Sequence, residues 1–369
     1  MKYSYFALIL ILLSFFGSHI SQGAIPTFDI EAVIEKSVLD SSDFEIIDNF
    51  VYRSIAELLS TTDFTSVANI RSTILRYSNS NKDSAQEQYS NAFYDSVYRH
   101  VGAALSKIES VDSAKVRENI LINLLILLDE LDNWRLTEYA VRYLNSENTV
   151  VRYWALHNVT NNSIIEQMNS DAEGLLLAKD IAKHILQQAE QAEANEQSLM
   201  LKFASEITLK DGDDIILRIA DVRMDRYKNW EVEYELLDAM LLRLLKNEIA
   251  NSNPEKQKAF GRRFCTLFSY VFQRFIKGID ILSEEHLRNL ASALVDVERN
   301  CVSSILGQVQ ITIKQAIESD NLAGLLEEHN RLLGDRTKAG ELPKRLNCDY
   351  GSNPDGSSRM YPPVLPDAP

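Results

Sequence analysis

Proline is nearly absent from most of this chain. The 369 residues contain only 8 prolines, and six of these lie at or beyond Pro343. Between Thr27 and Leu342 the only proline is Pro254. A proline inside a helix removes a backbone donor and costs about 3 kcal/mol, so a long stretch with one proline is typical of helices. Pro254 itself suits a helix start, because Asn253 can cap the helix that follows. The sequence therefore predicts a helical body and a different kind of tail.

Cysteine is also scarce, with three residues at Cys265, Cys301 and Cys348, which excludes a disulfide-framework protein. Cys265 and Cys301 lie in apolar helical contexts, which favours buried thiols. Cys348 lies in the polar tail and could attach that tail to the body. Both three free thiols and one intrachain disulfide stay open at this point. No histidine accompanies a cysteine in a recognisable signature, so we expect no catalytic thiol.

Several chemical signatures are missing as well. The 53 acidic and 38 basic side chains give a net charge of −15, which argues against a nucleic-acid partner. The sequence has no nucleophile elbow, no phosphate loop and no dinucleotide fingerprint. No two histidines beyond residue 24 lie within four residues of each other, which excludes the usual zinc spacings. We therefore expect no catalytic residue, no metal and no cofactor.

The first residues have the features of a signal peptide. Lys2 precedes the apolar run Tyr5–Phe16, which is shorter than the ~20 residues that a membrane span needs. Ser21 and Gly23 then frame a site for cleavage. We expect a signal peptide at residues 1–23 and an exported chain, periplasmic or secreted, with no stable membrane insertion after cleavage. An uncleaved anchor and a buried N-terminal helix are the alternatives.

Apolar residues recur at intervals of three and four along the body, which indicates short helices. Strand-like alternation is nearly absent, and Val309–Ile313 is the one tempting case. The segments with the helical period are 70–77, 116–128, 136–144, 150–159, 175–186, 232–245, 260–276 and 282–297. We expect a helical repeat region over 24–250, a helical continuation over 251–338, and a proline-rich tail over 339–369 that is extended or disordered.

Two of these segments resemble each other. The segment from Val116 to Leu124 aligns with the segment from Val151 to Val159 at an offset of 35 residues. A Val-Arg pair opens both, leucine stands sixth, asparagine eighth, and an aliphatic residue ninth. A weaker copy begins at Ile70. A single helical unit cannot bury its apolar face alone, but a stack of such units can. The repetition therefore predicts a stack.

The stretch 112–165 resembles a HEAT repeat, in which the second helix of a hairpin commonly begins with Val-Arg after a polar turn. The resemblance is visible over about residues 60–165 and does not continue convincingly at Val222. It implies an all-α, armadillo-type α-solenoid of antiparallel helical hairpins whose concave surface binds a partner. Another helical array or a multi-helix domain is the alternative.

Polar and aromatic residues gather around the better repeat. Exposed, they would form a platform for a peptide or a glycan, because Tyr and Trp dominate binding hot spots. Packing between repeats is the other interpretation. The candidate binding residues are Arg117, Arg152, Tyr153, Trp154 and His157.

Two further patterns have alternative interpretations. A phenylalanine stripe between Phe260 and Phe275, flanked by basic residues, is either a core helix or a membrane-surface helix. Asn158 and Asn161 begin glycosylation sequons that matter only in a eukaryotic host.

The sequence as a whole predicts an exported, noncatalytic scaffold or adaptor. An α/α-helical carbohydrate-active enzyme, a glycan lyase or hydrolase, is the alternative.

Overall fold

The structure, a computed structural model, describes residues 27–78, 84–353 and 356–368. The signal peptide predicted at residues 1–23 lies outside these ranges. Nearly all regular structure in the described residues is helical, which confirms the all-α class. The strands described there are β1 (Gly334–Asp335) and β2 (Lys338–Ala339), which form a small antiparallel hairpin. The chain divides into two compact units, with the boundary between Leu131 and Asp132.

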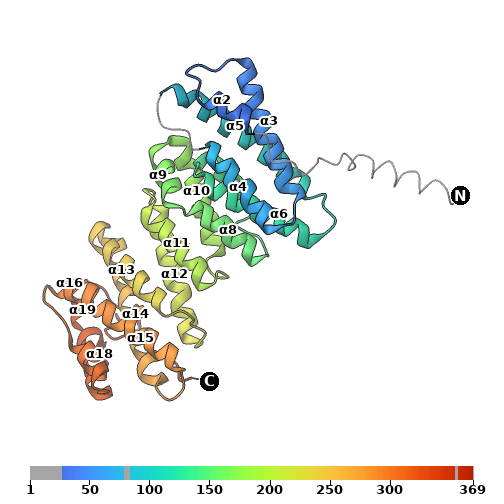
Figure 1. The fold of residues 1–369 in the computed structure, drawn as a ribbon. Helices are drawn as coiled ribbons and strands as arrows, with labels where there is room; N and C mark the ends of the chain where they lie inside the picture. The colour runs from blue at the N-terminus through green and yellow to red at the C-terminus, as the bar shows by residue number, and fades with distance from the viewer. Residues whose placement is uncertain (1–26, 79–83, 354–355, 369) are drawn as a thin grey trace, which may run out of the picture. The chain divides into compact units, whose positions relative to one another are not determined.

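The N-terminal unit consists of helices that pack on their neighbours along the chain (Figure 1). A capping box closes the start of α3, where Asp40 accepts from the backbone of Asp43 and the Asp43 side chain accepts from that of Asp40. The core includes Phe50, whose ring meets the Tyr77 ring edge-on at 5.3 Å. Its helices are α2 (Phe28–Ile34), α3 (Ser41–Ser60), α4 (Phe64–Ser78), α5 (Ser84–Ile108) and α6 (Ala114–Leu131).

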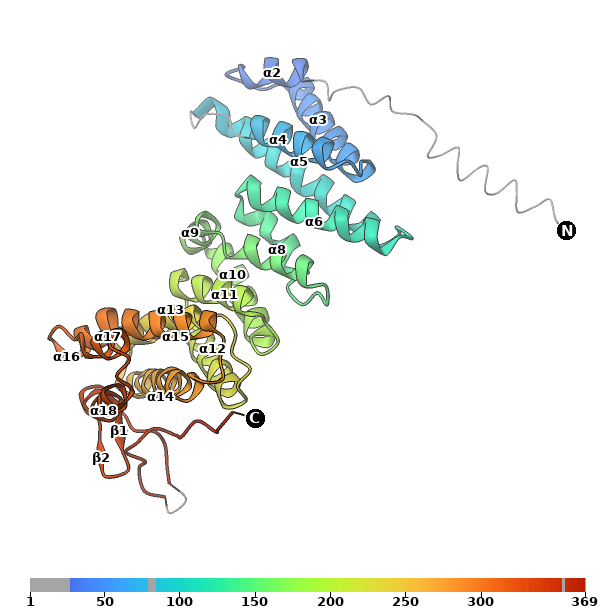
Figure 2. The same ribbon diagram turned by 60° about the horizontal axis from the view of Figure 1, so that its bottom comes forward.

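The C-terminal unit is larger, and α14 lies at its centre, against α12, α13, α15, α18 and α19. Figure 2 shows α14 nearly end-on among its neighbours. The elements of this unit before α14 are η1 (Trp134–Leu136), α7 (Thr137–Val141), α8 (Thr149–Val159), α9 (Asn162–Ser170), α10 (Ala172–Gln188), α11 (Ala194–Glu206), α12 (Asp211–Lys228) and α13 (Leu236–Asn251). Those from α14 onward, besides the hairpin, are α14 (Pro254–Gly278), α15 (Glu284–Val297), the π-helical turn η2 (Glu298–Val302), α16 (Ser303–Leu306), α17 (Thr312–Glu318), α18 (Leu322–Leu333) and α19 (Glu341–Arg345).

Helix α14 is a core helix, as one interpretation of its phenylalanine stripe predicted. Asn253 caps it by accepting from the backbone N–H of Lys256, and Pro254 occupies the first turn. The other face of α14 is basic and pairs with carboxylates of α12, the α12–α13 loop and the tail, rather than facing solvent alone. The side chains of the stripe with no exposed surface are Phe260, Phe264, Phe268 and Phe272.

Two predicted helices differ in extent from those observed. The segment predicted at 136–144 begins at the last residue of the 3-10 turn η1 and contains only the five-residue α7, because the chain turns again after Val141. The helix predicted from residue 232 begins at Leu236. The residues before it form a loop in which Trp230 and Tyr234 have φ values of 62° and 52°. Such backbone is uncommon for residues other than glycine and interrupts the helix.

The tail predicted at 339–369 begins with the short helix α19. Its described residues beyond Asn347 contain no helix and are held against α14 by hydrogen bonds. Gln273 donates to the carbonyl of Pro363 (2.9 Å) and accepts from the backbone N–H of Leu365 (2.7 Å). Lys277 donates to the carbonyl of Leu365 at 2.7 Å, and the side chain of Leu365 is fully buried. Trp230 donates from Nε1 to the carbonyl of Pro366 at 3.0 Å. The tail is therefore a specific part of this unit's packing.

Asp349 fixes the start of this tail. Its carboxylate lies 2.9 Å from Lys258 Nζ and 2.5 Å from Arg262 Nη2, and it accepts from the backbone N–H of Gly351 at 3.0 Å. Burial alone would raise the pKa of Asp349, but the hydrogen bonds from Lys258, Gly351 and Arg262 outweigh it and lower the pKa to about 2. The pKa of Asp349 is lower in the folded chain than in the unfolded chain, so the ionised carboxylate stabilises the fold above about pH 4. This stabilisation is lost as the pH falls toward 2.

Replacing Asp349 by Asn should therefore lower the free energy of unfolding by about 1–2 kcal/mol at pH 7, a value reduced for partial solvent screening. The variant should also lose less stability than the natural chain between pH 4 and pH 2. Urea unfolding at pH 7, 4 and 3 measures both effects. Asp367→Asn is the control, because Asp367 pairs with Lys277 in the same tail but is almost fully exposed. If the free energy of unfolding falls equally steeply below pH 4 in the natural chain and in Asp349→Asn, this account is wrong.

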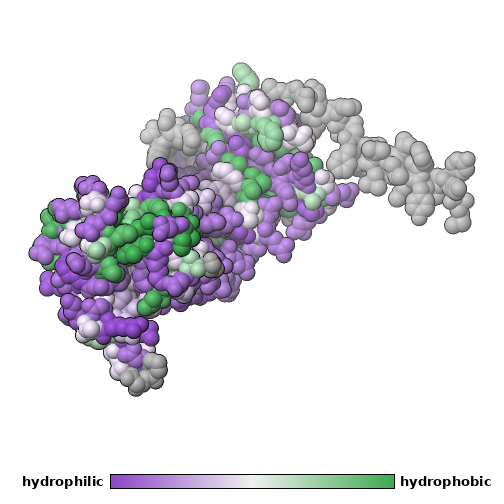
Figure 3. Space-filling view, turned by 90° about the horizontal axis from the view of Figure 1, so that it is seen from below, coloured by the Kyte–Doolittle hydropathy of each residue, from purple (hydrophilic) through white to green (hydrophobic). Residues whose placement is uncertain are grey.

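Exposed apolar side chains remain on the C-terminal unit. They include Leu326 of α18 and Met360 and Val364 of the tail, each at least half exposed. Figure 3 shows hydrophobic residues gathered among hydrophilic ones on the face of this unit that is turned to the viewer. Within the described residues, no helix is both long and apolar enough to cross a membrane.

Candidate functional site

The two related segments both lie in helices, and their matching residues occupy equivalent positions there. Val116 opens its segment within α6, and Val151 does so within α8. The sixth and ninth residues of both segments are buried, as a repeated inward face requires: Leu121 and Leu124 in α6, and Leu156 and Val159 in α8. The two helices thus bury the same positions of the aligned motif.

The arginines of the two Val-Arg pairs make the same backbone contact. Arg117 donates from Nη1 to the carbonyl of Val111 at 3.1 Å, and Arg152 donates from Nη1 to the carbonyl of Ser146 at 2.8 Å. In each case the acceptor lies six residues earlier, in the turn before the helix. Arg71 of the weaker copy donates instead to the side chain of Asn123 at 3.1 Å. The shared contact gives the Val-Arg pair a physical role, which is to satisfy a carbonyl of the preceding turn.

Arg152 also joins two helices. Its Nε lies 2.7 Å and its Nη2 3.3 Å from the two carboxylate oxygens of Glu196 on α11. Both side chains are almost fully buried. A bidentate pair of this kind fixes geometry as well as charge. We interpret Arg152 as a residue that positions α8 against α11.

The aromatic candidates of α8 form one cluster. The rings of Tyr153 and Trp154 have centroids 5.8 Å apart, and the His157 ring lies 6.0 Å from the first and 5.3 Å from the second. All three side chains are half-buried. Val150 is one turn before Trp154, and 49% of its side chain is exposed. These four residues recur at helical spacing and form an accessible strip, which we call the α8 aromatic face.

The α8 aromatic face also has two polar groups, one on Tyr153 and one on Trp154. Within the described residues, neither the hydroxyl of Tyr153 nor the indole Nε1 of Trp154 has a hydrogen-bond partner. Tyr and Trp combine a large apolar ring with one polar group, which suits them to binding surfaces. Of the five candidate residues, the structure brings together Arg152, Tyr153, Trp154 and His157 on α8. Arg117 belongs to the N-terminal unit.

The two sequons are in different environments. Asn158 is a fully buried residue of α8, and within the described chain neither atom of its amide has a hydrogen-bond partner. Asn161 caps α9 by accepting from the backbone N–H of Ser163 at 3.1 Å. A glycan on Asn158 is incompatible with the folded position of that side chain.

A buried charge cluster between α12, α13 and α14 was not predicted from the sequence. Arg223 pairs with Asp238 through two contacts of 2.7 and 2.8 Å, and Tyr227 donates to the same carboxylate at 2.7 Å. These three side chains have no exposed surface. Glu235 is equally buried. Its carboxylate lies 3.8 Å from Arg274 and accepts a hydrogen bond from Nδ1 of His286 at 2.6 Å.

Burial and the nearby charges raise the pKa of Tyr227, so its hydroxyl stays a donor at neutral pH. Val222 and Arg223 repeat the Val-Arg pair, but the residues after them break the repeat pattern. No spacing signal links Arg223 to Asp238, because they lie on different helices. The described residues contain no group of three or more His, Cys, Asp or Glu side chains that could hold a metal ion.

Comparisons with known proteins assign no family to this chain. No protein-family model matches the sequence, and no curated protein matches it. Among solved structures, the crystal structure of an engineered protein from the Northeast Structural Genomics Consortium aligns with 86% of this chain and 92% of its own, at 15% identity and a TM-score of 0.23. A similarity this low carries no argument about fold or function.

Proposed function

We propose that this protein is an exported, noncatalytic α-solenoid of HEAT-like hairpins that acts as a scaffold or adaptor for a protein partner. The observation that carries the proposal is the α8 aromatic face, a half-buried cluster in which the rings of Tyr153, Trp154 and His157 lie within 6.0 Å of one another. An accessible cluster of aromatic rings is typical of a protein-binding hot spot. In this proposal, residues 24–250 form the repeat region and 251–338 continue it.

The repeat assignment is supported by the contact that Arg117 and Arg152 share. In a helical repeat protein, the same residue makes the same contact in successive units, because each unit packs in the same way on the next. The buried sixth and ninth positions of both segments agree with this. Export is supported by the apolar run Tyr5–Phe16 in the sequence.

The test is loss of a partner on removal of the α8 aromatic face. We expect the double variant Tyr153→Ala plus Trp154→Ala to reduce recovery of a specific cross-linked partner from the native host by about tenfold or more, since hot-spot aromatics contribute about 2 kcal/mol or more each. Quantitative mass spectrometry after affinity purification measures the recovery. Circular dichroism verifies that the variant keeps its helix content.

The matched control is Phe28→Ala plus Phe64→Ala, which removes two highly exposed aromatic side chains elsewhere. This variant should recover the partner as the natural chain does. Identical sets of co-purifying proteins from the natural chain and the α8 variant would overturn the proposal. Turnover of a glycan by the purified protein would instead support the carbohydrate-active alternative.

A further inference from the structure

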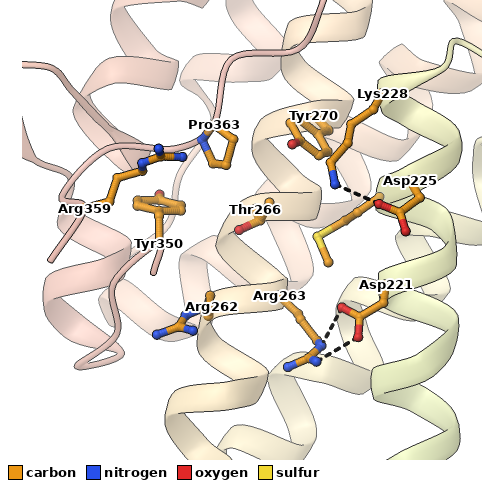
Figure 4. A pocket seen from close by; sticks show the side chains of 11 residues that line it. Asp221, Asp225, Lys228, Arg262, Arg263, Thr266, Tyr270, Tyr350, Arg359 and Pro363 are labelled. Carbon is orange, nitrogen blue, oxygen red and sulfur yellow. Dashed lines mark hydrogen bonds and ion pairs between the residues drawn. The ribbon is translucent and has the colours of Figure 1, made fainter. Parts of the chain in front are cut away.

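A charged cavity of about 490 Å³ lies within the C-terminal unit, between α12, α14 and the tail. Figure 4 shows Tyr350, Arg359 and Pro363 of the tail on one side and Asp225 and Lys228 of α12 on the other. Thr266 and Tyr270 of α14 lie between them. The volume is in the range of small-molecule sites, which is about 300–1,000 Å³.

Positive charge exceeds negative charge around this cavity. Arg263 forms a bidentate pair with Asp221, with both contacts at 2.8 Å, and Lys228 lies 2.7 Å from Asp225. Arg262 shares the carboxylate of Asp349 with a second cation, Lys258. Lys258 and Asp349 do not themselves line the cavity. With Arg359, the lining has four cations and two carboxylates, an excess of two positive charges in a chain whose net charge is −15.

Arg359 is the cation of this set that has no carboxylate partner among the described residues. Its Nε lies 3.5 Å from Asn353 Oδ1, at the limit of a hydrogen bond, and its guanidinium lies 5.9 Å from the centre of the Tyr361 ring. A guanidinium has five N–H donors in a planar arrangement that matches carboxylate and phosphate oxygens. Most of these donors are therefore available on the tail side of the cavity.

Two hydroxyl groups also line the cavity. Tyr270 is 1% exposed and Thr266 is 9% exposed, and the side chains of both lie at the cavity (Figure 4). Burial raises the pKa of Tyr270, so the phenol remains a donor at neutral pH. A bound molecule with an acceptor oxygen can take hydrogen bonds from both hydroxyls in place of the water in the cavity.

We propose that this cavity binds a small organic phosphate monoester, with Arg359 as the main contact to the phosphate and the hydroxyls of Thr266 and Tyr270 as further donors. A phosphate monoester is close to a dianion at neutral pH, so it balances the excess of two positive charges. The ring of Tyr350 and the side chains of Met224 and Pro363 supply an apolar wall for the organic part. Inorganic phosphate would leave most of the volume empty.

The test uses phenyl phosphate as the probe and isothermal titration calorimetry of the full chain at low ionic strength. We expect saturable binding of one equivalent that weakens as sodium chloride is added, because salt screens the charges. Arg359→Gln should weaken binding about tenfold, as expected for a lost charge-assisted hydrogen bond. Tyr270→Phe, which keeps the ring and removes only the hydroxyl, should weaken it about fivefold.

The matched control is Arg299→Gln, which removes the same charge at an exposed position of the same unit. It should bind phenyl phosphate as the natural chain does. Tryptophan fluorescence and circular dichroism show whether each variant keeps its fold, and Tyr270→Phe provides a second, conservative test if Arg359→Gln perturbs the tail. The proposal fails if phenyl phosphate does not bind at millimolar concentration, if Arg299→Gln weakens binding equally, or if benzoate binds as tightly as phenyl phosphate.

Discussion

Replacing Asp238 by Ala should lower the free energy of unfolding of the C-terminal unit by about 3–5 kcal/mol, because it leaves the Arg223 guanidinium buried without a counter-ion. Arg223 and Asp238 have no exposed surface, so water cannot replace the lost partner. The substitution also removes the acceptor of the Tyr227 hydroxyl. Of the contacts of Arg223, the hydrogen bond from Nη1 to the carbonyl of Glu233 at 3.0 Å would remain.

Tryptophan fluorescence is a suitable measurement, since the three tryptophans of the chain, Trp134, Trp154 and Trp230, all lie in the C-terminal unit. Guanidinium chloride unfolding followed by this signal reports on that unit alone. The control is Glu190→Ala, which breaks the exposed pair between Glu190 and Arg218. Arg218 lies on α12, the helix that also contains Arg223. An exposed pair contributes about 0–1 kcal/mol, so this variant should be nearly as stable as the natural chain.

A double variant separates the charge from the packing. Arg223→Met combined with Asp238→Leu replaces the pair by apolar side chains and should recover much of the loss, because no unpaired charge is then buried. If Asp238→Ala costs no more than Glu190→Ala, the buried pair is not the stabilising contact that the geometry indicates.

Refolding in a glutathione redox buffer should join Cys265 to Cys348 and stabilise the C-terminal unit by about 2–4 kcal/mol. Both thiols are reduced in the structure, with their Sγ atoms 3.9 Å apart, and one is on α14 while the other is in the tail. A disulfide needs about 2.05 Å between the sulfurs, so a small shift of the tail suffices. The pair would close a long loop, which is where a cross-link restricts the unfolded chain most.

The reaction is an exchange in which the two thiols lose two protons and two electrons, and oxidised glutathione is reduced to two thiols. Cys348 is half-buried and can react first, and Cys265 then displaces glutathione. Burial and the contact with Cys348 raise the pKa of Cys265, so this second step should be slow in the folded chain and faster during refolding. Refolding is therefore the better condition for the experiment.

Peptide mapping without reduction should find Cys265 linked to Cys348 and Cys301 free. Cys301 is fully buried on η2, and Cys301→Ser should leave the cross-link unchanged. Unfolding of the oxidised chain with and without a reductant measures the stabilisation. A cross-link that contains Cys301, or equal stability of the oxidised and reduced chains, would contradict the prediction.

Much of the fold could be predicted from local patterns. A chain with one proline between Thr27 and Leu342 and with apolar residues at helical spacing has to form helices, because backbone hydrogen bonds and burial of the apolar faces then agree. The stripe from Phe260 to Phe272 indicated a helix with one apolar face in the same way, and Asn253 indicated where that helix begins. The structure decided that this face is buried in the core. These signals act over a few turns of one helix, so a linear sequence contains them in full.

The candidate site was predictable in part. The spacing of Tyr153, Trp154 and His157 placed their side chains on one side of a helix, and the rings indeed meet there. That Arg152 would pair with Glu196 was not predictable, because 44 positions separate them. The same holds for the cavity, where Arg359 of the tail faces Lys228 of α12.

The sequence by itself therefore determined the helical class, the position of the core helix α14 and the similarity of two segments. Only the tertiary structure decided which charges and thiols meet: Arg223 with Asp238, Cys265 with Cys348, and Asp349 with two cations of α14. The physical reason is that helix formation follows from neighbours three or four residues apart. Pairing between helices depends on how their packed faces are rotated and aligned, which the interactions of the whole unit decide together.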